Sequence, residues 1–211
     1  MPRKATSERQ IRSQILKQKI RDASWSLIRD KGYDAVTIDD ICAAVGVTKG
    51  TFYNHFSSKE QPILDNIVVD NLHYRNNLRP QVKKMKPGLG KLRAFLRLAI
   101  AYESGREKAM TGFSYKYRIA DLKSSPPVIP DKREFFRILD EFIAEGQQSG
   151  EIRRDVGSSE LAQVVLYSIR GLVYSWCLPD THFDLREKGE DLLAVLIEGL
   201  RPGSLPPFVI R

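Results

Sequence analysis

Residues 36–64 read VTIDDICAAVGVTKGTFYNHFSSKEQPIL. Thr37 stands immediately before an apolar-periodic segment and three residues before Asp40, which is the position of a helix N-cap. Gly46 permits the positive φ that a sharp helix exit requires, and Thr48 is placed to cap a second short helix. Two short helices joined by a tight turn that contains glycine predict a helix-turn-helix. In the first of these two helices, the residues expected to face the protein core are Ile41, Ala44 and Val45.

The second helix of this motif, predicted over residues 49–56, has an apolar side and a polar side. Phe52 and Phe56 are four residues apart and therefore share the inner side. The opposite side carries small polar residues, which is the kind of face that a helix needs to read base edges in the major groove of DNA. The expected base contacts are Lys49, Gly50, Thr51 and Asn54.

Donors suited to phosphate oxygens flank this face. Ser57 and Glu60 predict a capping box at the start of the next helix, whose free amides would add to a phosphate site. Pro62 falls near the fourth or fifth position of that helix, where it would kink the helix or shift its start. The expected phosphate contacts are Thr37, Thr48, Tyr53, His55 and Lys59.

The same stretch resembles the DNA-binding domain of the TetR/AcrR family of bacterial transcriptional regulators. The family pattern is matched in order and without a break at Thr37, Ile41, Gly46, Val47, Thr48, Gly50, Tyr53, His55, Phe56 and Lys59. Cys42 and Val45 stand where alanine is usual in the family. The resemblance covers residues 12–64 and implies a ligand-responsive regulator, mostly a repressor in this family, that binds double-stranded operator DNA as a homodimer. In some members a basic N-terminal arm also reaches the minor groove, and the residues suited to this here are Arg3, Lys4, Arg9 and Arg12.

The remainder of the chain also has helical periodicity, beginning with an apolar stripe at Ile11, Ile15, Ile20, Ala23, Leu27 and Ile28. Helices are predicted from near Ser57 towards Lys84, after the breaker at 84–90, and over about 107–122, 131–149, 158–178 and 185–200, with a loop at 124–130. The fold class is therefore all-α, with about nine helices. Residues 1–60 are expected to form a three-helix helix-turn-helix domain. By the resemblance, residues 61–211 are expected to form a helical ligand-binding and dimerisation domain.

Two features of the second domain bear on its expected roles. The helix at 158–178, capped by Ser158 or Ser159, and the helix at 185–200 have apolar faces broad enough for a four-helix bundle between subunits, although an intramolecular core is the alternative. Aromatic residues are candidates for the effector pocket, with ordinary core packing as the alternative for each. They are Phe95, Tyr102, Phe113, Tyr117, Phe142, Tyr174 and Trp176.

Residues 71–123 carry thirteen Lys and Arg against three Asp and Glu. One hypothesis is that one or two of the arginines line the pocket and select an anionic effector. The alternative is a solvated basic surface near the DNA. The arginines concerned are Arg75, Arg79, Arg93, Arg97, Arg106 and Arg118.

Composition narrows the class of protein further. The net charge of +8 over 211 residues favours an anionic partner. The chain has no apolar run of the roughly 18 residues that a membrane-spanning helix requires, and no secretory signal, so a cytoplasmic location is expected. Nucleotide-binding and hydrolase motifs are absent, and neither the two cysteines nor the three histidines have metal or catalytic spacing. We therefore expect no enzymatic activity, metal or cofactor. The alternative function is a non-regulatory helical ligand-binding or interaction protein that retains a helix-turn-helix domain.

Overall fold

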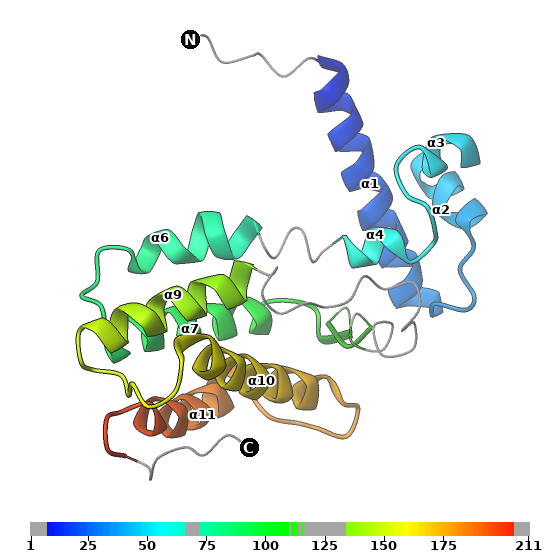
Figure 1. The fold of residues 1–211 in the computed structure, drawn as a ribbon. Coiled ribbons are helices and arrows are strands. Elements are labelled where there is room, and N and C mark those ends of the chain that lie inside the picture. The colour runs from blue at the N-terminus through cyan, green and yellow to red at the C-terminus, as the bar shows by residue number, and fades with distance from the viewer. Residues whose placement is uncertain (1–7, 66–71, 110, 114, 116–133, 205–211) are drawn as a thin grey trace, which may run out of the picture. The chain divides into compact units, whose positions relative to one another are not determined.

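The computed structural model describes residues 8–65, 72–109, 111–113, 115 and 134–204. All regular secondary structure in these residues is helical, which confirms the predicted all-α class (Figure 1). The chain divides into two compact units, residues 1–67 (unit 1) and residues 68–211 (unit 2).

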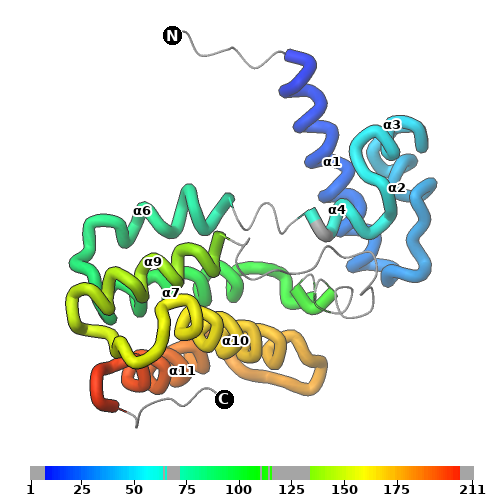
Figure 2. Tube along the Cα trace, in the orientation of Figure 1, coloured from blue at the N-terminus to red at the C-terminus, as the bar shows by residue number. Residues whose placement is uncertain are grey.

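Unit 1 contains four helices: α1 (Glu8–Lys31), α2 (Ile38–Val45), α3 (Lys49–Tyr53) and α4 (Gln61–Leu64). Helices α2 and α4 pack against α1, and α3 packs against α2 (Figure 2). Ile11 and Ile15, at the amino-terminal end of the predicted apolar stripe of α1, are about half exposed. The packing partners α2 and α4 are 8 and 4 residues long, so they cover only part of a 24-residue helix. The fully buried apolar side chains of the unit include Ile20, Ile41, Phe52, Phe56 and Ile63.

The helix predicted to start near Ser57 begins instead at Gln61, with Pro62 in its first turn. Proline suits this position because its missing N–H is not needed in a first turn, so the shift that Pro62 suggested is confirmed. The predicted capping box between Ser57 and Glu60 was wrong. The hydroxyl of Ser57 donates to Oε1 of Gln61 at 2.7 Å, whereas Glu60 accepts a hydrogen bond from the Tyr33 hydroxyl.

Unit 2 begins, among the described residues, with a π-helical turn, η1 (Tyr74–Leu78), that runs into α6 (Arg79–Val82). Pro80 lies in the first turn of α6 and has no amide hydrogen to donate, which accounts for a widened turn just before it. The middle of the long helix predicted between Ser57 and Lys84 lies outside the described residues.

The remaining helices of unit 2 are α7 (Leu89–Ser104), α9 (Glu134–Gln148), α10 (Ser158–Cys177) and α11 (Leu185–Gly199). The described residues between 108 and 115 are also helical, and we call them segment 108–115. Helix α9 packs on α10, α7 packs on α11, and α10 lies beside α11 (Figures 1 and 2). The predicted helix limits within 134–200 agree with the observed ones to within one residue at each described end.

Aromatic and aliphatic side chains from α7 and α9 form the centre of the unit 2 core. The rings of Phe95 and Phe142 meet edge to face at 5.5 Å, and Phe95 also stacks on Phe135 at 5.6 Å. Helices α7 and α11 approach closely at Gly189, where an added Cβ would lie 2.9 Å from Cγ2 of Ile100. The apolar residues predicted on one face of α9 are all buried: Phe135, Phe136, Leu139, Phe142 and Ile143.

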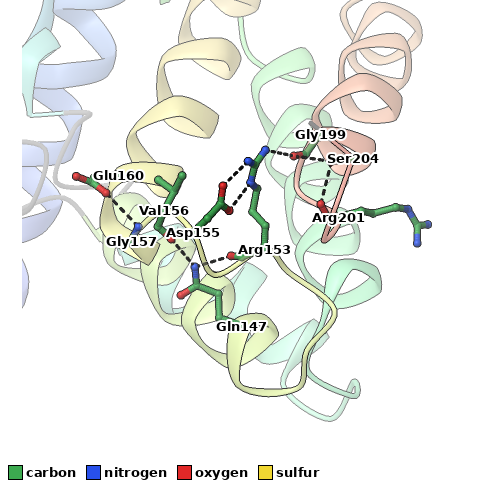
Figure 3. Close-up of polar contacts among 9 residues, drawn as sticks. All are labelled: Gln147, Arg153, Asp155, Val156, Gly157, Glu160, Gly199, Arg201 and Ser204. Atoms are coloured by element: carbon green, nitrogen blue, oxygen red, sulfur yellow. Dashed lines mark hydrogen bonds and ion pairs between the residues drawn. The ribbon is translucent and has the colours of Figure 1, made fainter. Parts of the chain in front are cut away.

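Figure 3 shows how the loop between α9 and α10 is fastened to the end of α11. The buried guanidinium of Arg153 donates to both carboxylate oxygens of Asp155, at 2.8 and 2.6 Å, and to the Gly199 carbonyl at 3.4 Å. The backbone amide of Arg153 donates to the Leu200 carbonyl. The side-chain amide of Gln147 donates to two carbonyls of the same loop. The predicted capping of α10 by Ser158 or Ser159 was wrong, because Glu160 caps its start by accepting the amide of Gly157 at 3.0 Å.

Candidate nucleic-acid interface

The turn between α2 and α3 has the caps that its sequence predicts. Oγ1 of Thr37 accepts the amide of Asp40 at 3.2 Å, and the Asp40 carboxylate accepts the amide and hydroxyl of Thr37 at 2.8 and 2.6 Å. These hydrogen bonds hold the pKa of Asp40 below its ordinary value. Gly46 ends α2 with φ of 74°, and Oγ1 of Thr48 accepts the amide of Thr51 at 3.2 Å. Local hydrogen bonds therefore fix the direction in which α3 leaves α2.

Helix α3 has the orientation predicted from its wheel. Phe52 and Phe56 are buried, with ring centroids 5.8 Å apart. Helical hydrogen bonding continues beyond the end of α3, since the amide of Phe56 donates to the carbonyl of Phe52. The predicted base-contacting residues lie on the outer side, where Lys49, Gly50 and Asn54 are exposed and Thr51 is partly exposed.

The inner face of α2 differs from the prediction. Ile41 is buried as expected, but Ala44 is exposed and Val45 is only partly buried, whereas Cys42 is buried. Because α2 packs against both α1 and α3, its buried face is centred between Ile41 and Cys42. Burial raises the pKa of the Cys42 thiol, which is therefore a protonated, small apolar group in this core.

Lys49 forms an ion pair with Asp39 at 2.9 Å, and both side chains are more than half exposed. This contact joins the first turn of α2 to the first turn of α3, and it raises the pKa of Lys49. The sequence analysis placed both residues on the correct helices but did not predict their ion pair. An acidic and a basic residue at the amino ends of two adjacent short helices are the feature that could have predicted it. The contact with Asp39 uses one of the three ammonium hydrogens of Lys49, so the other two remain for a base.

The hydroxyl groups expected to contact phosphates already make hydrogen bonds within the motif. Thr37 donates to Asp40 at 2.6 Å, and the hydroxyls of Thr48 and Thr51 lie 3.0 Å apart, with either able to donate. Only one hydroxyl of that threonine pair uses its hydrogen in their contact, so the other retains a donor for an outside acceptor. Tyr53 is 53% exposed, with its ring edge-on to Phe52, and His55 is partly buried beside Phe56.

Lys59 is directed into unit 1 rather than outward. Its ammonium donates to the carbonyl oxygens of Tyr33 and Val36, each at 2.8 Å, and lies 3.9 Å from the centroid of the Tyr33 ring. These contacts connect the turn between α1 and α2 to the residues that precede α4. They leave at most one of the three ammonium hydrogens for the phosphate contact that the sequence predicts.

The expected N-terminal arm is only partly described. Arg3 and Lys4 lie outside the described residues. Arg9 and Arg12 are exposed on α1, where Arg12 forms an ion pair with Glu8 at 3.3 Å.

The aromatic residues predicted for an effector pocket have different surroundings in unit 2. Phe95 and Phe142 are packed in the core, which is the alternative to a pocket position that the sequence analysis gave for them. Tyr102 is partly buried and stacks on His73 at 3.9 Å, while Phe113 and Trp176 are partly buried and Tyr174 is 42% exposed. Tyr117 lies outside the described residues. A cavity of about 200 Å³ in the described part of the unit has a different lining: Arg97, Ile100, Ala101, Arg186 and Glu190.

Most arginines that the sequence suggested for an anionic effector are already paired with carboxylates. Arg79 contacts Glu141 at 2.6 Å, and Arg93 and Arg97 share Glu190 at 3.2 and 2.5 Å. Arg106 lies 3.6 Å from Glu103, whereas Arg75 is exposed and contacts Asn76, and Arg118 lies outside the described residues.

The described residues contain no cluster of three or more His, Cys, Asp or Glu side chains arranged to hold a metal ion. No helix within the described ranges combines the length and apolar character needed to cross a membrane.

Comparison with known proteins places this geometry in a family. Residues 20–61 match the family model described as bacterial regulatory proteins, tetR family, and residues 130–199 match the C-terminal region of YsiA-like proteins. The fatty acid metabolism regulator protein of Bacillus subtilis (strain 168) is 23% identical over 86% of this chain and 93% of its own length. The repressor DhaR of Mycobacterium sp. (strain GP1) is 26% identical over 90% and 94%.

The fold is also found among solved structures. The structure of Thermus thermophilus FadR, a TetR-family transcriptional repressor in complex with lauroyl-CoA, superposes with a TM-score of 0.70. It covers 90% of this chain and 98% of that chain at 21% identity, so the likeness establishes the fold. The helix-turn-helix geometry, the two family matches and the relatives agree, and the chain belongs to the TetR family of bacterial regulatory proteins.

Proposed function

We propose that this protein is a transcriptional repressor that binds operator DNA as a homodimer and releases it when unit 2 binds a small-molecule effector. The observation that carries the proposal is the orientation of α3, whose two phenylalanines are buried and whose small polar residues face outward. A helix that enters the major groove requires such a face.

On α3, the base contacts are assigned to Lys49, Gly50, Thr51 and Asn54. Tyr53 is the strongest candidate for a phosphate contact, because it is 53% exposed beside the outer face of α3. His55, Thr37 and Thr48 complete the phosphate set. Lys59 is assigned a structural role in unit 1 instead, because its ammonium donates to the carbonyls of Tyr33 and Val36.

Exposed apolar side chains support the dimer. On α10, Val164, Tyr167 and Tyr174 follow one helical face and are 46%, 56% and 42% exposed. Leu178, directly after α10, is 38% exposed, and Val195 on α11 is 72% exposed. An apolar stripe of this kind favours association, and a two-fold pair of subunits matches two operator half-sites. Replacing Tyr167 and Val195 together with glutamate should yield monomers in analytical ultracentrifugation. A dimer of unchanged dissociation constant would place the interface elsewhere.

The relatives suggest the chemical class of the effector. The C-terminal match is to YsiA-like proteins, and the similar Thermus thermophilus repressor was solved with lauroyl-CoA. We assign to this chain an effector that joins an acyl chain to an anionic group. Effector binding would shift the dimer to a state in which the two α3 helices no longer match successive major grooves, and operator affinity would fall.

Selection of bound sequences from a random duplex pool, followed by gel-shift titration, tests DNA binding directly. Tyr53→Ala should weaken binding to all selected sequences alike, whereas Asn54→Ala should alter the preference at one base by roughly 1–3 kcal/mol. Tyr53→Phe is the matched control for the phenol, since it keeps the ring and removes the hydroxyl. Failure to enrich any sequence, or normal operator binding by Tyr53→Ala, would contradict the assignment.

A further inference from the structure

Lys17 on α1 contacts two parts of unit 1 that are distant from it in the sequence. Its ammonium lies 2.6 Å from Oδ2 of Asp65, the residue that follows α4, and 5.2 Å from the centroid of the Phe56 ring. Phe56 follows α3, and its amide continues the helical hydrogen bonding of that helix. One ammonium therefore joins α1 to the residues that follow α3 and α4.

The burial of these contacts distinguishes Lys17 from a lysine in a surface ion pair. The side chain of Asp65 is 17% exposed and that of Lys17 is 39% exposed, whereas Glu8 and Arg12, which pair on the same helix, are 87% and 81% exposed. A carboxylate that is largely removed from water depends on its cation far more than a solvated carboxylate does. The face of an aromatic ring also attracts a cation at this distance. Both contacts therefore restrain the ammonium.

Asp65 lies where the chain leaves unit 1. Unit 1 ends at residue 67, so the covalent path to unit 2 passes through Asp65. Before α4, Lys59 donates to two carbonyls of the turn between α1 and α2 and fastens the chain there. After α4, the ion pair with Lys17 fastens Asp65 to α1. A displacement that unit 2 transmits along the chain therefore passes through a residue that is held by Lys17.

We propose that Lys17 couples Asp65 to the recognition helix α3, so that the position of the chain leaving unit 1 regulates operator binding. This inference rests on the proposed function and names a contact that regulates its DNA site. While the ion pair holds, the ammonium is kept against the Phe56 ring. When Asp65 moves away or loses its charge, the ammonium is free to leave the ring for water, and the end of α3 loses a restraint. Lys17 is a positioning residue, since it acts on the DNA contacts through Phe56.

Asp65→Asn is the most informative change, because two effects on operator affinity have opposite signs. Removal of a carboxylate from unit 1 should by charge alone strengthen DNA binding. Loss of the restraint on Phe56 should weaken it, and we expect a net loss of roughly three- to tenfold in gel-shift titrations with a selected operator duplex. Asp22→Asn removes an exposed carboxylate from α1 and is the matched control, which should not weaken binding. Operator binding by Asp65→Asn as tight as that of the control would overturn the proposal.

A double-mutant cycle tests whether the effect of Asp65 passes through Lys17. Lys17→Met should also weaken operator binding, and Asp65→Asn should cause no further loss in the Lys17→Met background. Losses that add in full would overturn the coupling, because they would show that the two residues act independently.

Amide hydrogen exchange of the full-length protein without DNA supplies a second readout. The amides of His55 and Phe56 donate to the carbonyl of Phe52 at 2.9 and 3.0 Å, and their exchange should accelerate in Asp65→Asn. The amide of Ile28, in the buried carboxyl-terminal part of α1, should change much less. Equal acceleration at Ile28 would show a role in overall stability alone and would overturn the proposal. If Lys17→Met does not fold, the isosteric Asp65→Asn still decides by this comparison.

The two measurements separate this inference from the proposed function. If the wild type binds operator and Asp65→Asn leaves both the affinity and the exchange of Phe56 unchanged, the repressor assignment stands and the coupling is refuted. If the wild type binds no DNA, the proposed function fails, while the exchange of Phe56 still shows whether Asp65 acts on α3.

Discussion

Replacing Lys59 with methionine is expected to destabilise unit 1 while leaving its phosphate contacts with DNA unchanged. The ammonium donates to two backbone carbonyls at 2.8 Å and lies 3.9 Å from the Tyr33 ring centroid. A hydrogen bond from a charged donor is worth roughly 1.5–3 kcal/mol when buried. Lys59 is only partly buried, so we take about 1 kcal/mol for each bond and expect a loss of about 2 kcal/mol.

Tryptophan fluorescence can follow unit 1 alone, because the chain has two tryptophans, with Trp25 in α1 and Trp176 in α10. In a Trp176→Phe background, urea unfolding monitored by the fluorescence of Trp25 should show the expected decrease in the free energy of unfolding for Lys59→Met. The control Lys19→Met changes an exposed lysine of α1 and should stay within about 0.5 kcal/mol of its parent.

The salt dependence of operator binding decides between the structural role and the phosphate role of Lys59. Each phosphate contact contributes about 0.9 to the slope of log K against log salt concentration, so losing one per subunit would reduce the slope by about 1.8. We expect an unchanged slope for Lys59→Met under conditions where it is folded. A Lys59→Met protein as stable as the control and with a reduced slope would refute the structural reasoning.

Asp39→Asn should raise operator affinity several-fold, because it frees Lys49 from an exposed ion pair and removes a negative charge near the DNA face; weaker binding in gel shifts would instead show that Asp39 orients Lys49. Gly46→Ala should destabilise unit 1 by about 1 kcal/mol in urea unfolding, since φ is 74° and no atom lies within 4 Å of an added Cβ, so the loss is purely conformational. The pKa of Asp40 is lowered in the folded state by hydrogen bonds from Thr37, so its contribution to stability is present above the unfolded pKa and is lost as pH falls through the folded value. The urea concentration at the unfolding midpoint of unit 1 should therefore decrease as the pH is lowered below about 4, and Asp40→Asn should reduce this decrease. Parallel plots of midpoint against pH for the two proteins would exclude the Asp40 carboxylate as the cause.

The sequence by itself determined the helices, the turn and the outward face of α3. Thr37, Gly46 and Thr48 act through hydrogen bonds or backbone angles within a few residues of themselves, and the spacing of Phe52 and Phe56 fixes which side of α3 is buried. Such short-range interactions depend only on the local sequence, so the helix-turn-helix could be predicted without knowledge of any tertiary contact.

Only the tertiary structure decided which polar side chains form hydrogen bonds and ion pairs, and with which partners. Lys59 bonds to carbonyls 23 and 26 residues away, and Lys49 meets Asp39 only once the turn between their helices has formed. In unit 2, Arg79 and Arg97 pair with carboxylates on neighbouring helices, whereas Nη2 of Arg170 is buried with no hydrogen-bond partner among the described residues. The physical reason is that a long charged side chain can reach several acceptors or none, and its choice depends on which groups the folded chain brings within a few ångströms.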